Sequence, residues 1–353
     1  MKKVAIVGAG KRFLNVYLPI FKKLEKDYEI VGFVSRTEEK GRSIEKSHGI
    51  QFFKSVESLI DSENPDFFIA PLKENVSYDV VSSLIKYDIP VLIETPISDQ
   101  RFSSLIPQSS KIGVVEQWPF LPLEQFKQSI FNSGLINRPF LVQNDGRSFD
   151  YHAIAQLRSY LGMNSRPVYV TGNAVAVKSP LFIDNNGKES DAVDSWDIGT
   201  VKFENGSVLV HNFSYLCKTA PYRVMQSLRS YSDNGTIFTG KKDDKDNDYE
   251  IIDARYVSNK ETNALKIQVD RDENGNVKKI YDELSKISWT PPYEYASLTD
   301  HEIAISSHLF EMSRSIDEGT DLLYTLLDAF IDYMLISGIK QACYTGKTVR
   351  FNA

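Results

Sequence analysis

The chain has 353 residues, of which 42% are hydrophobic and 25% are charged, and its formal net charge at pH 7 is -6. This length allows two domains with a sizeable core each, and the composition is typical of a globular protein. The acidic balance and the lack of a basic cluster argue against nucleic acid as the main partner, and no apolar stretch is long enough to span a bilayer. Cys217 and Cys343 form no disulfide framework or metal-binding spacing, so we expect a cytoplasmic protein without a metal site.

A glycine-rich turn follows the first predicted strand. The apolar run 4–7 is too short for a helix and ends at a Gly-Ala-Gly sequence, after which a helical pattern begins. A strand, a tight turn and a helix in this order present backbone N–H groups to an anion such as a dinucleotide pyrophosphate. The candidate residues are Gly8, Gly10, Lys11, Arg12 and Phe13. The complete fingerprint has a third glycine at Phe13, so a buried strand with a small-residue turn is the alternative.

The second predicted strand, 29–34, ends in three potential donors instead of an acid. A dinucleotide fold commonly places an acidic residue about 20 residues beyond the glycine turn, on the adenosine ribose 2′-hydroxyl. Here the positions are Ser35, Arg36 and Thr37, whose hydroxyls and guanidinium suit a 2′-phosphate. The sequence therefore predicts NADP(H) and makes NAD less favoured. The alternative is an arginine that is merely solvated at a strand end.

Strands and helices continue to alternate up to about residue 120. We predict helices at 38–48, 56–61 and 78–87, and strands at 51–53, 65–71, 90–94 and 113–120. This alternation indicates an α/β fold with a parallel sheet, a Rossmann domain over residues 1–120. Ligands of such sheets lie beyond the carboxyl ends of the strands, so residues 8–13, 35–37, 70–75 and 94–96 should face one crevice.

The sequence pattern of the second half of the chain indicates an α+β domain over residues 121–353. Helices are expected at 123–132, 150–161, 300–316 and 322–343, the last of which could pack back on the first domain. Strands are expected at 140–144, 168–177, 198–203, 208–216, 223–231, 249–257, 265–269 and 348–351. Asn-Gly pairs at 186–187, 205–206, 234–235 and 274–275 supply hairpin turns, which indicates a large, mostly antiparallel sheet. The charged run 241–248 is interpreted as a solvated loop and not as a metal site.

The strand ends resemble those of the glucose-fructose oxidoreductase and inositol 2-dehydrogenase (Gfo/Idh/MocA) superfamily. Ala70-Pro71-Leu72-Lys73-Glu74-Asn75 stands where members carry Thr-Pro-Asn and then a histidine, and Asn75 occupies the place of that histidine. Glu94-Thr95-Pro96 stands where members carry Glu-Lys-Pro. The resemblance implies that Ala70, Pro71, Asn75, Glu94 and Thr95 line the nucleotide site. It also makes Thr95 the largest departure, because the family lysine contacts both substrate and nicotinamide.

The stretch 150–162 resembles the active-site helix of the same superfamily, in which a histidine is followed by an aspartate and then a glycine. His152 and Gly162 keep this spacing, whereas Ala155 replaces the aspartate. Imidazole exchanges protons near neutral pH, so His152 is the best candidate for a general acid, with a satisfied core histidine as the alternative. Tyr151 is a possible second donor, and Tyr160 another. The remaining histidines, His48, His211, His301 and His308, are expected to be structural or solvated.

These observations predict an NADPH-dependent oxidoreductase that transfers a hydride to a small-molecule C=N, C=C or C=O group. The loss of the lysine and the aspartate favours an imine or a conjugated double bond over a sugar alcohol. Ser35-Arg36 together with a lysine-free Glu-x-Pro turn also resembles family members such as biliverdin reductase and thiazolinyl imine reductase. Three alternatives remain. They are an NADP-binding sensor or accessory protein whose catalytic set has decayed, a keto-sugar reductase, and a redox-neutral glycosidase, which Ser35 and Arg36 disfavour. The resemblance also implies a homo-oligomer, a dimer or tetramer, formed through the open face of the second sheet.

Overall fold

The computed structural model describes residues 1–146, 149–183, 189–214, 225–242 and 249–351. The chain divides into two structural units. Unit 1 consists of Met1–Pro122, Val269–Lys279 and Thr290–Ile331, and unit 2 consists of Leu123–Gln268, Ile280–Trp289 and Asp332–Ala353. Each unit therefore contains segments that are distant in the sequence. No helix in these described ranges is long and apolar enough to cross a bilayer.

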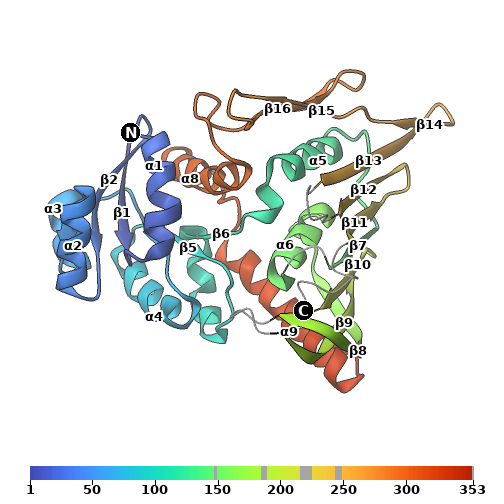
Figure 1. The fold of residues 1–353 in the computed structure, drawn as a ribbon, viewed down its shortest axis with the longest axis horizontal. Coiled ribbons are helices and arrows are strands. Elements are labelled where there is room, and N and C mark those ends of the chain that lie inside the picture. The colour runs from blue at the N-terminus through green and yellow to red at the C-terminus, as the bar shows by residue number, and fades with distance from the viewer. Residues whose placement is uncertain (147–148, 184–188, 215–224, 243–248, 352–353) are drawn as a thin grey trace. The chain divides into compact units, whose positions relative to one another are not determined.

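Unit 1 is built on a six-stranded sheet with the strand order β3-β2-β1-β4-β5-β6, in which every pair is parallel. The strands are β1 (Lys2–Val7), β2 (Tyr28–Val34), β3 (Phe52–Phe53), β4 (Phe67–Ala70), β5 (Val91–Glu94) and β6 (Ile112–Val115). The central strands are continuous apolar runs because helices cover both faces of the sheet, as Figure 1 shows beside β1 and β2. The predicted Rossmann sheet is confirmed, and its strand order reverses between β1 and β4.

The helices of unit 1 agree with the predicted ranges 38–48, 56–61 and 300–316 to within two residues, but one begins at Glu74 instead of 78, and the one at 100–111 was not predicted. They are η1 (Phe13–Tyr17), α1 (Leu18–Lys23), α2 (Glu38–His48), α3 (Val56–Glu63), α4 (Glu74–Leu84), η2 (Ile85–Tyr87), η3 (Gln100–Lys111), η4 (Trp118–Phe120) and α8 (Asp300–Glu318). Capping boxes at Ser55 and Thr299 start α3 and α8. The strand predicted for 113–120 is wrong beyond Val115, because Pro119 has no N–H to donate and the chain turns into η4.

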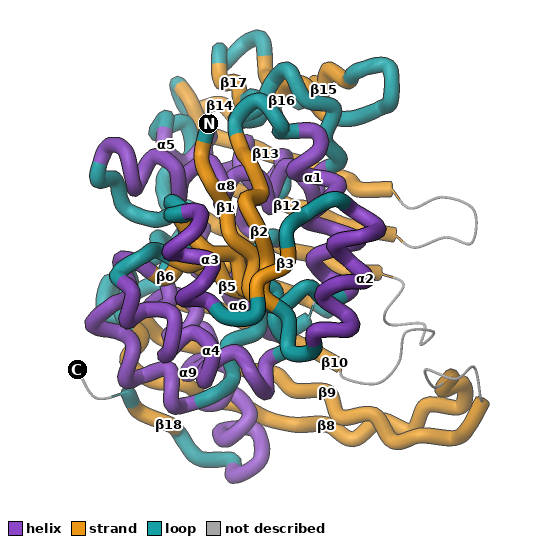
Figure 2. Tube along the Cα trace, turned by 90° about the vertical axis from the view of Figure 1, so that its left-hand side faces the viewer, coloured by secondary structure: helices purple, strands orange, loops and turns teal. Residues whose placement is uncertain are grey.

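Unit 2 contains a nine-stranded sheet with the order β14-β13-β12-β11-β7-β10-β9-β8-β18. Its strands are β7 (Leu141–Asp145), β8 (Pro167–Ile183), β9 (Glu189–Phe203), β10 (Val208–Ser214), β11 (Met225–Tyr231), β12 (Gly235–Lys242), β13 (Tyr249–Ser258), β14 (Glu261–Ala264) and β18 (Val349–Arg350). Neighbouring strands are antiparallel except for β7 and β10. Figure 2 shows β8 and β9 side by side as a long ribbon. The predicted mostly antiparallel sheet is confirmed.

A third sheet contains β15 (Gln268–Arg271), β16 (Val277–Asp282) and β17 (Ile287–Trp289). The strand predicted at 265–269 is confirmed only for 268–269, since β14 ends at Ala264 and β15 begins at Gln268. The Asn-Gly pairs 205–206, 234–235 and 274–275 do join consecutive strands, and Gly206 and Gly275 have φ of 87° and 81°. The pair 186–187, Cys217 and most of the charged run 241–248 lie outside the described residues.

Two helices of unit 2, α5 (Pro122–Asn132) and α6 (Asp150–Leu161), lie on one face of its large sheet (Figure 1). The last helix, α9 (Leu326–Thr345), packs closely on β9, because a Cβ at Gly199 would lie 2.5 Å from Ile339. On the opposite face of β8 and β9, Val175 and Ile198 are exposed. Association of copies through this face stays a prediction.

Candidate nucleotide-binding site

The first turn contains two glycines, and the structure around them differs. Gly8 has a φ of 99°, and a Cβ there would lie 2.3 Å from Leu72 of the loop after β4. The protein itself therefore requires glycine at this position. A Cβ on Gly10 would meet no atom of the described residues within 4 Å, apart from its chain neighbours. Gly10 thus leaves its backbone open to a ligand, as a pyrophosphate contact requires.

The helix after the turn begins with a hydrogen bond from Leu14 N–H to Gly10 O, of 3.1 Å. The N–H groups of the first helical turn have no acceptor inside the helix, so anions commonly bind at this end of a helix. The next turn, η1, is a π-helix whose first residue, Phe13, is fully buried. Only the backbone of Phe13 is therefore available to a nucleotide. The Lys11 side chain is exposed. The turn with Gly8 and Gly10, followed by this helix start, therefore fits a dinucleotide.

Glu94, at the end of β5, is fixed by two residues of the first helix. Arg12 Nε and Nη2 donate to Glu94 Oε1 and Oε2 at 2.9 and 3.1 Å, and Tyr17 OH donates to Glu94 Oε1. Burial, reinforced by the Glu94 carboxylate, raises the pKa of Tyr17 well above its ordinary value. These contacts neutralise Arg12 and tie the turn containing Thr95 to the helix. No sequence pattern indicated them, because Tyr17 and Glu94 are 77 residues apart.

The end of β2 carries donors that the protein does not use. Arg36 and Thr37 are exposed and Ser35 is half-buried, and within the described part of the chain none of their side chains has a hydrogen-bond or ion-pair partner. Glu38 is the nearest acid in α2, but its carboxylate lies 3.0 Å from Lys54 Nζ, which lowers the pKa of Glu38. A cation and two hydroxyls therefore remain available at this strand end.

The loop after β4 brings the next group of predicted residues to the same edge of the sheet. Ala70 is the last residue of β4, and it and Pro71 are buried, so they can contribute only shape and backbone. Lys73 is the N-cap residue of α4, and Asn75 lies in its first turn. Both side chains are exposed. Parallel strands place these residues and Thr95 beyond neighbouring strand ends.

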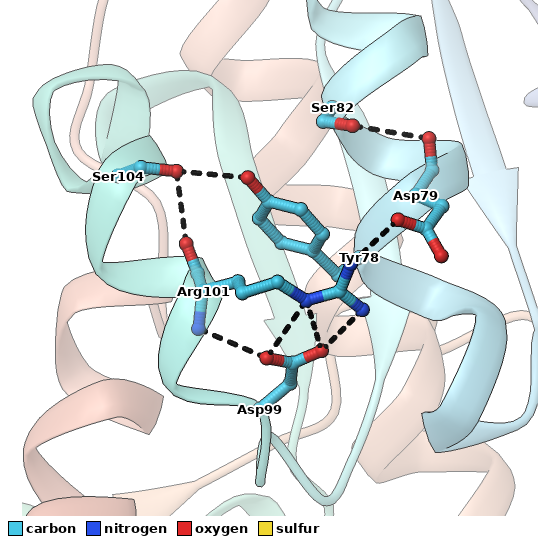
Figure 3. A network of polar contacts seen from close by, with 6 residues as sticks. All are labelled: Tyr78, Asp79, Ser82, Asp99, Arg101 and Ser104. Carbon is cyan, nitrogen blue, oxygen red and sulfur yellow. Dashed lines mark hydrogen bonds and ion pairs between the residues drawn. The ribbon is translucent and has the colours of Figure 1, made fainter.

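A cluster of polar contacts around Arg101, which no sequence pattern indicated, joins α4 to η3 (Figure 3). Arg101 donates to Asp99 Oδ2 at 2.7 Å and to Asp79 Oδ1 at 2.9 Å, and its Cζ lies 4.4 Å from the centre of the Tyr78 ring. Tyr78 OH lies 3.0 Å from Ser104 Oγ. The charge of Arg101 is thus used to hold together the helices that follow β4 and β5.

Unit 2 carries the predicted general acid on α6. His152 is half-buried, and its ring centre lies 4.1 Å from that of Tyr151. Tyr160, on the same helix, is fully buried, and its hydroxyl donates to Glu124 of α5. Tyr160 is therefore a packing residue and not a second proton donor.

Two of the other histidines are buried and structural, as expected. In unit 1, His308 Nε2–H donates to the carbonyl of Glu116 at 2.6 Å, and burial lowers the pKa of His308 to about 4. In unit 2, His211 Nδ1 lies 3.2 Å from Asn144 Nδ2, and burial lowers the pKa of His211 to about 4. Both rings are neutral at pH 7. Among the described residues, no group of three or more His, Cys, Asp or Glu is arranged to hold a metal ion.

A hollow of about 460 Å³ lies in unit 1 along the first helix and the start of α8. Its lining includes Arg12, Asn15, Lys23, Gln117 and His301. The Lys23 ammonium in this lining is paired with Glu302 at 2.7 Å, and Arg12 is paired with Glu94. The Lys23 ammonium and the Arg12 guanidinium in this lining are therefore both already paired with carboxylates of unit 1.

Residues 2–105 match the sequence model of an oxidoreductase family with an NAD-binding Rossmann fold, the Gfo/Idh/MocA family. This segment of the chain belongs to the Gfo/Idh/MocA oxidoreductases. The resemblance expected from the strand ends is thereby confirmed for the nucleotide-binding domain. A search of curated proteins finds no match to the chain.

Solved structures share the fold over nearly the whole length. An oxidoreductase from Agrobacterium radiobacter, solved with NAD+, L-tartaric acid and magnesium, is 13% identical, with a TM-score of 0.67 over 99% of this chain and 98% of that chain. UDP-N-acetylglucosamine 3-dehydrogenase GnnA from Acidithiobacillus ferrooxidans is 12% identical, with a TM-score of 0.62 over 97% of each chain. GenD2 from gentamicin A biosynthesis, solved with NAD, is 14% identical, with a TM-score of 0.61 over 100% and 97%. At such identities the likeness concerns the fold alone, and this shared fold includes both units of the chain.

Proposed function

We propose that this Gfo/Idh/MocA protein is an NADPH-dependent reductase of a small molecule with a C=N, C=C or C=O group. The observation that carries the cofactor choice is the unused guanidinium of Arg36 at the end of β2, with Ser35 and Thr37 beside it. A 2′-phosphate is a doubly charged acceptor, and it satisfies all three donors. The ribose hydroxyl of NAD would leave the guanidinium without an anion. Two of the similar structures hold NAD, so this choice needs a direct test.

The reaction class follows from the groups that the chain offers. A bound nicotinamide nucleotide supplies hydride, and the protein must stabilise the charge that develops on the acceptor atom and provide a proton. Thr95, at the place of the family lysine, offers only a neutral hydroxyl. A protonated imine carries its own positive charge and depends less on a protein cation than a ketone does. This favours C=N or conjugated C=C reduction, with His152 as the proton donor.

Replacing Arg36 by alanine should weaken NADPH binding by about 10- to 100-fold and leave NADH binding unchanged within about twofold. The reason is that only NADPH carries the phosphate that the guanidinium meets. Titration calorimetry with both nucleotides measures the effect. Lys46→Ala is the matched control, because it removes an exposed positive charge from the other end of α2 and should change neither affinity. Tighter binding of NADH than NADPH to the unmodified protein would reject the cofactor assignment.

A nucleotide-binding sensor is the second candidate, and Thr95 and Ala155 favour it, since neither has an ionisable group. The two candidates differ in what His152 does. If the protein is a reductase, we expect NADPH oxidation, followed at 340 nm, with at least one member of a panel of cyclic imines, enones and keto-sugars. His152→Ala should then lower kcat by about 100-fold or more while the NADPH affinity stays the same. Binding of NADPH without turnover of any panel member would favour the sensor, and turnover of keto-sugars alone would reject the imine preference.

A further inference from the structure

The strand order of unit 1 divides the nucleotide crevice into two halves. A dinucleotide on this fold lies across the point where the strand order reverses, between β1 and β4, with one nucleotide on each side. Placing the 2′-phosphate at Arg36, after β2, puts the adenosine over β1-β2-β3. The nicotinamide then lies over the ends of β4, β5 and β6. This assignment rests on the proposed function, because it takes Arg36 as the phosphate site.

Most charges that the structure brings near the nicotinamide half are already neutralised. Arg12 is held by both carboxylate oxygens of Glu94. Arg101 is held by Asp99 and Asp79 (Figure 3). Thr95, at the end of β5, is neutral. Neither arginine can therefore act on the nicotinamide without breaking an existing ion pair.

Lys73 is different. It follows the end of β4 by three residues, and the last residue of β4, Ala70, is paired with Ile93 of β5. Lys73 and Thr95 therefore follow adjacent ends of neighbouring parallel strands. The Lys73 side chain is exposed, and within the described ranges its ammonium has no hydrogen bond and no ion pair. Its neighbour Glu74 starts α4, where the helix dipole favours a carboxylate.

We propose that Lys73 makes the site select the reduced nucleotide, a role that rests on the proposed function. The nicotinamide ring carries a positive charge in NADP+ and none in NADPH, so an ammonium near the ring repels only the oxidised form.

The experiment is a comparison of NADP+ and NADPH affinities in low-salt buffer, by calorimetry and by NADPH fluorescence. In Lys73→Met we expect the ratio of the NADP+ Kd to the NADPH Kd to fall about three- to tenfold, mainly through tighter NADP+ binding. Lys73→Arg, which keeps the charge, should leave the ratio near that of the unmodified protein. Glu74→Gln should raise the ratio, since it removes a neighbouring negative charge. Lys86→Met is the matched control, because Lys86 is also exposed and lies just beyond the other end of α4.

The outcomes separate this inference from the proposed function. If the unmodified protein binds neither nucleotide, the proposed function itself fails. If it binds both, and the ratio in Lys73→Met equals that in the unmodified protein or changes as much in Lys86→Met, the role of Lys73 is refuted while the cofactor assignment stands. A change confined to Lys73→Met and reversed by Lys73→Arg supports the role.

Discussion

Replacing Gly10 by valine should abolish nucleotide binding and leave the fold intact. Its Cβ would project into open space, with no described atom within 4 Å apart from its chain neighbours, so we expect the free energy of unfolding to change by less than about 1 kcal/mol. The same side chain would occupy the place where a pyrophosphate approaches the turn. The expected loss of NADPH affinity is at least about 100-fold, or about 2.7 kcal/mol. Calorimetric titration measures the affinity, and urea-induced unfolding measures the stability.

Gly8→Ala is the matched comparison, two residues away in the same turn. Here the φ of 99° and the 2.3 Å approach of Leu72 predict a destabilisation of about 2–4 kcal/mol, whether or not a nucleotide binds. The two variants thus distinguish a glycine needed for stability, Gly8, from a glycine needed for nucleotide binding, Gly10. Nucleotide binding by Gly10→Val at the level of the unmodified protein would show that the turn does not hold the pyrophosphate.

The parallel sheet of unit 1 could be predicted because its central strands are short apolar runs with turn residues after each. Burial on both faces leaves this pattern in the sequence, and Phe67–Ala70 is fully buried. β12 of unit 2 left a weaker pattern. It begins with Gly235 and ends with a glycine and two lysines, and only Ile237 and Thr239 of its described residues are buried. Strands that pack one face and have mixed composition are difficult to recognise without knowing their partners.

The polar contacts of the site could not be predicted, for a different reason. Gly8, Gly10 and the donors after β2 are local features, since a turn or a strand end determines them. The fixing of Glu94 by Arg12 and Tyr17 depends on the meeting of two strand ends that are far apart in the sequence. Which arginine is neutralised and which lysine stays available is therefore a property of the fold. The sequence placed Arg12 with the nucleotide, whereas in the structure its guanidinium is bound to Glu94.

The largest effect on stability should come from Lys127, on α5 of unit 2. Lys127 and Glu124 are completely buried, and Lys127 Nζ lies 2.7 Å from Glu124 Oε1 and 2.6 Å from Thr239 Oγ1. Tyr160 OH donates to the other oxygen of Glu124. In Lys127→Met the Glu124 carboxylate stays buried and loses its contact with the Lys127 ammonium, which should cost about 3–5 kcal/mol in urea-induced unfolding at pH 7. Lys86→Met, at an exposed position, should cost less than about 0.5 kcal/mol.

The double variant Lys127→Met/Glu124→Gln decides whether the buried charge of Glu124 causes the loss of stability. Glutamine keeps an acceptor for Tyr160 and carries no charge, so the double variant should recover more than half of the lost free energy. A deficit that persists in the double variant would mean that lost packing of the lysine chain, and not the buried charge, destabilises unit 2.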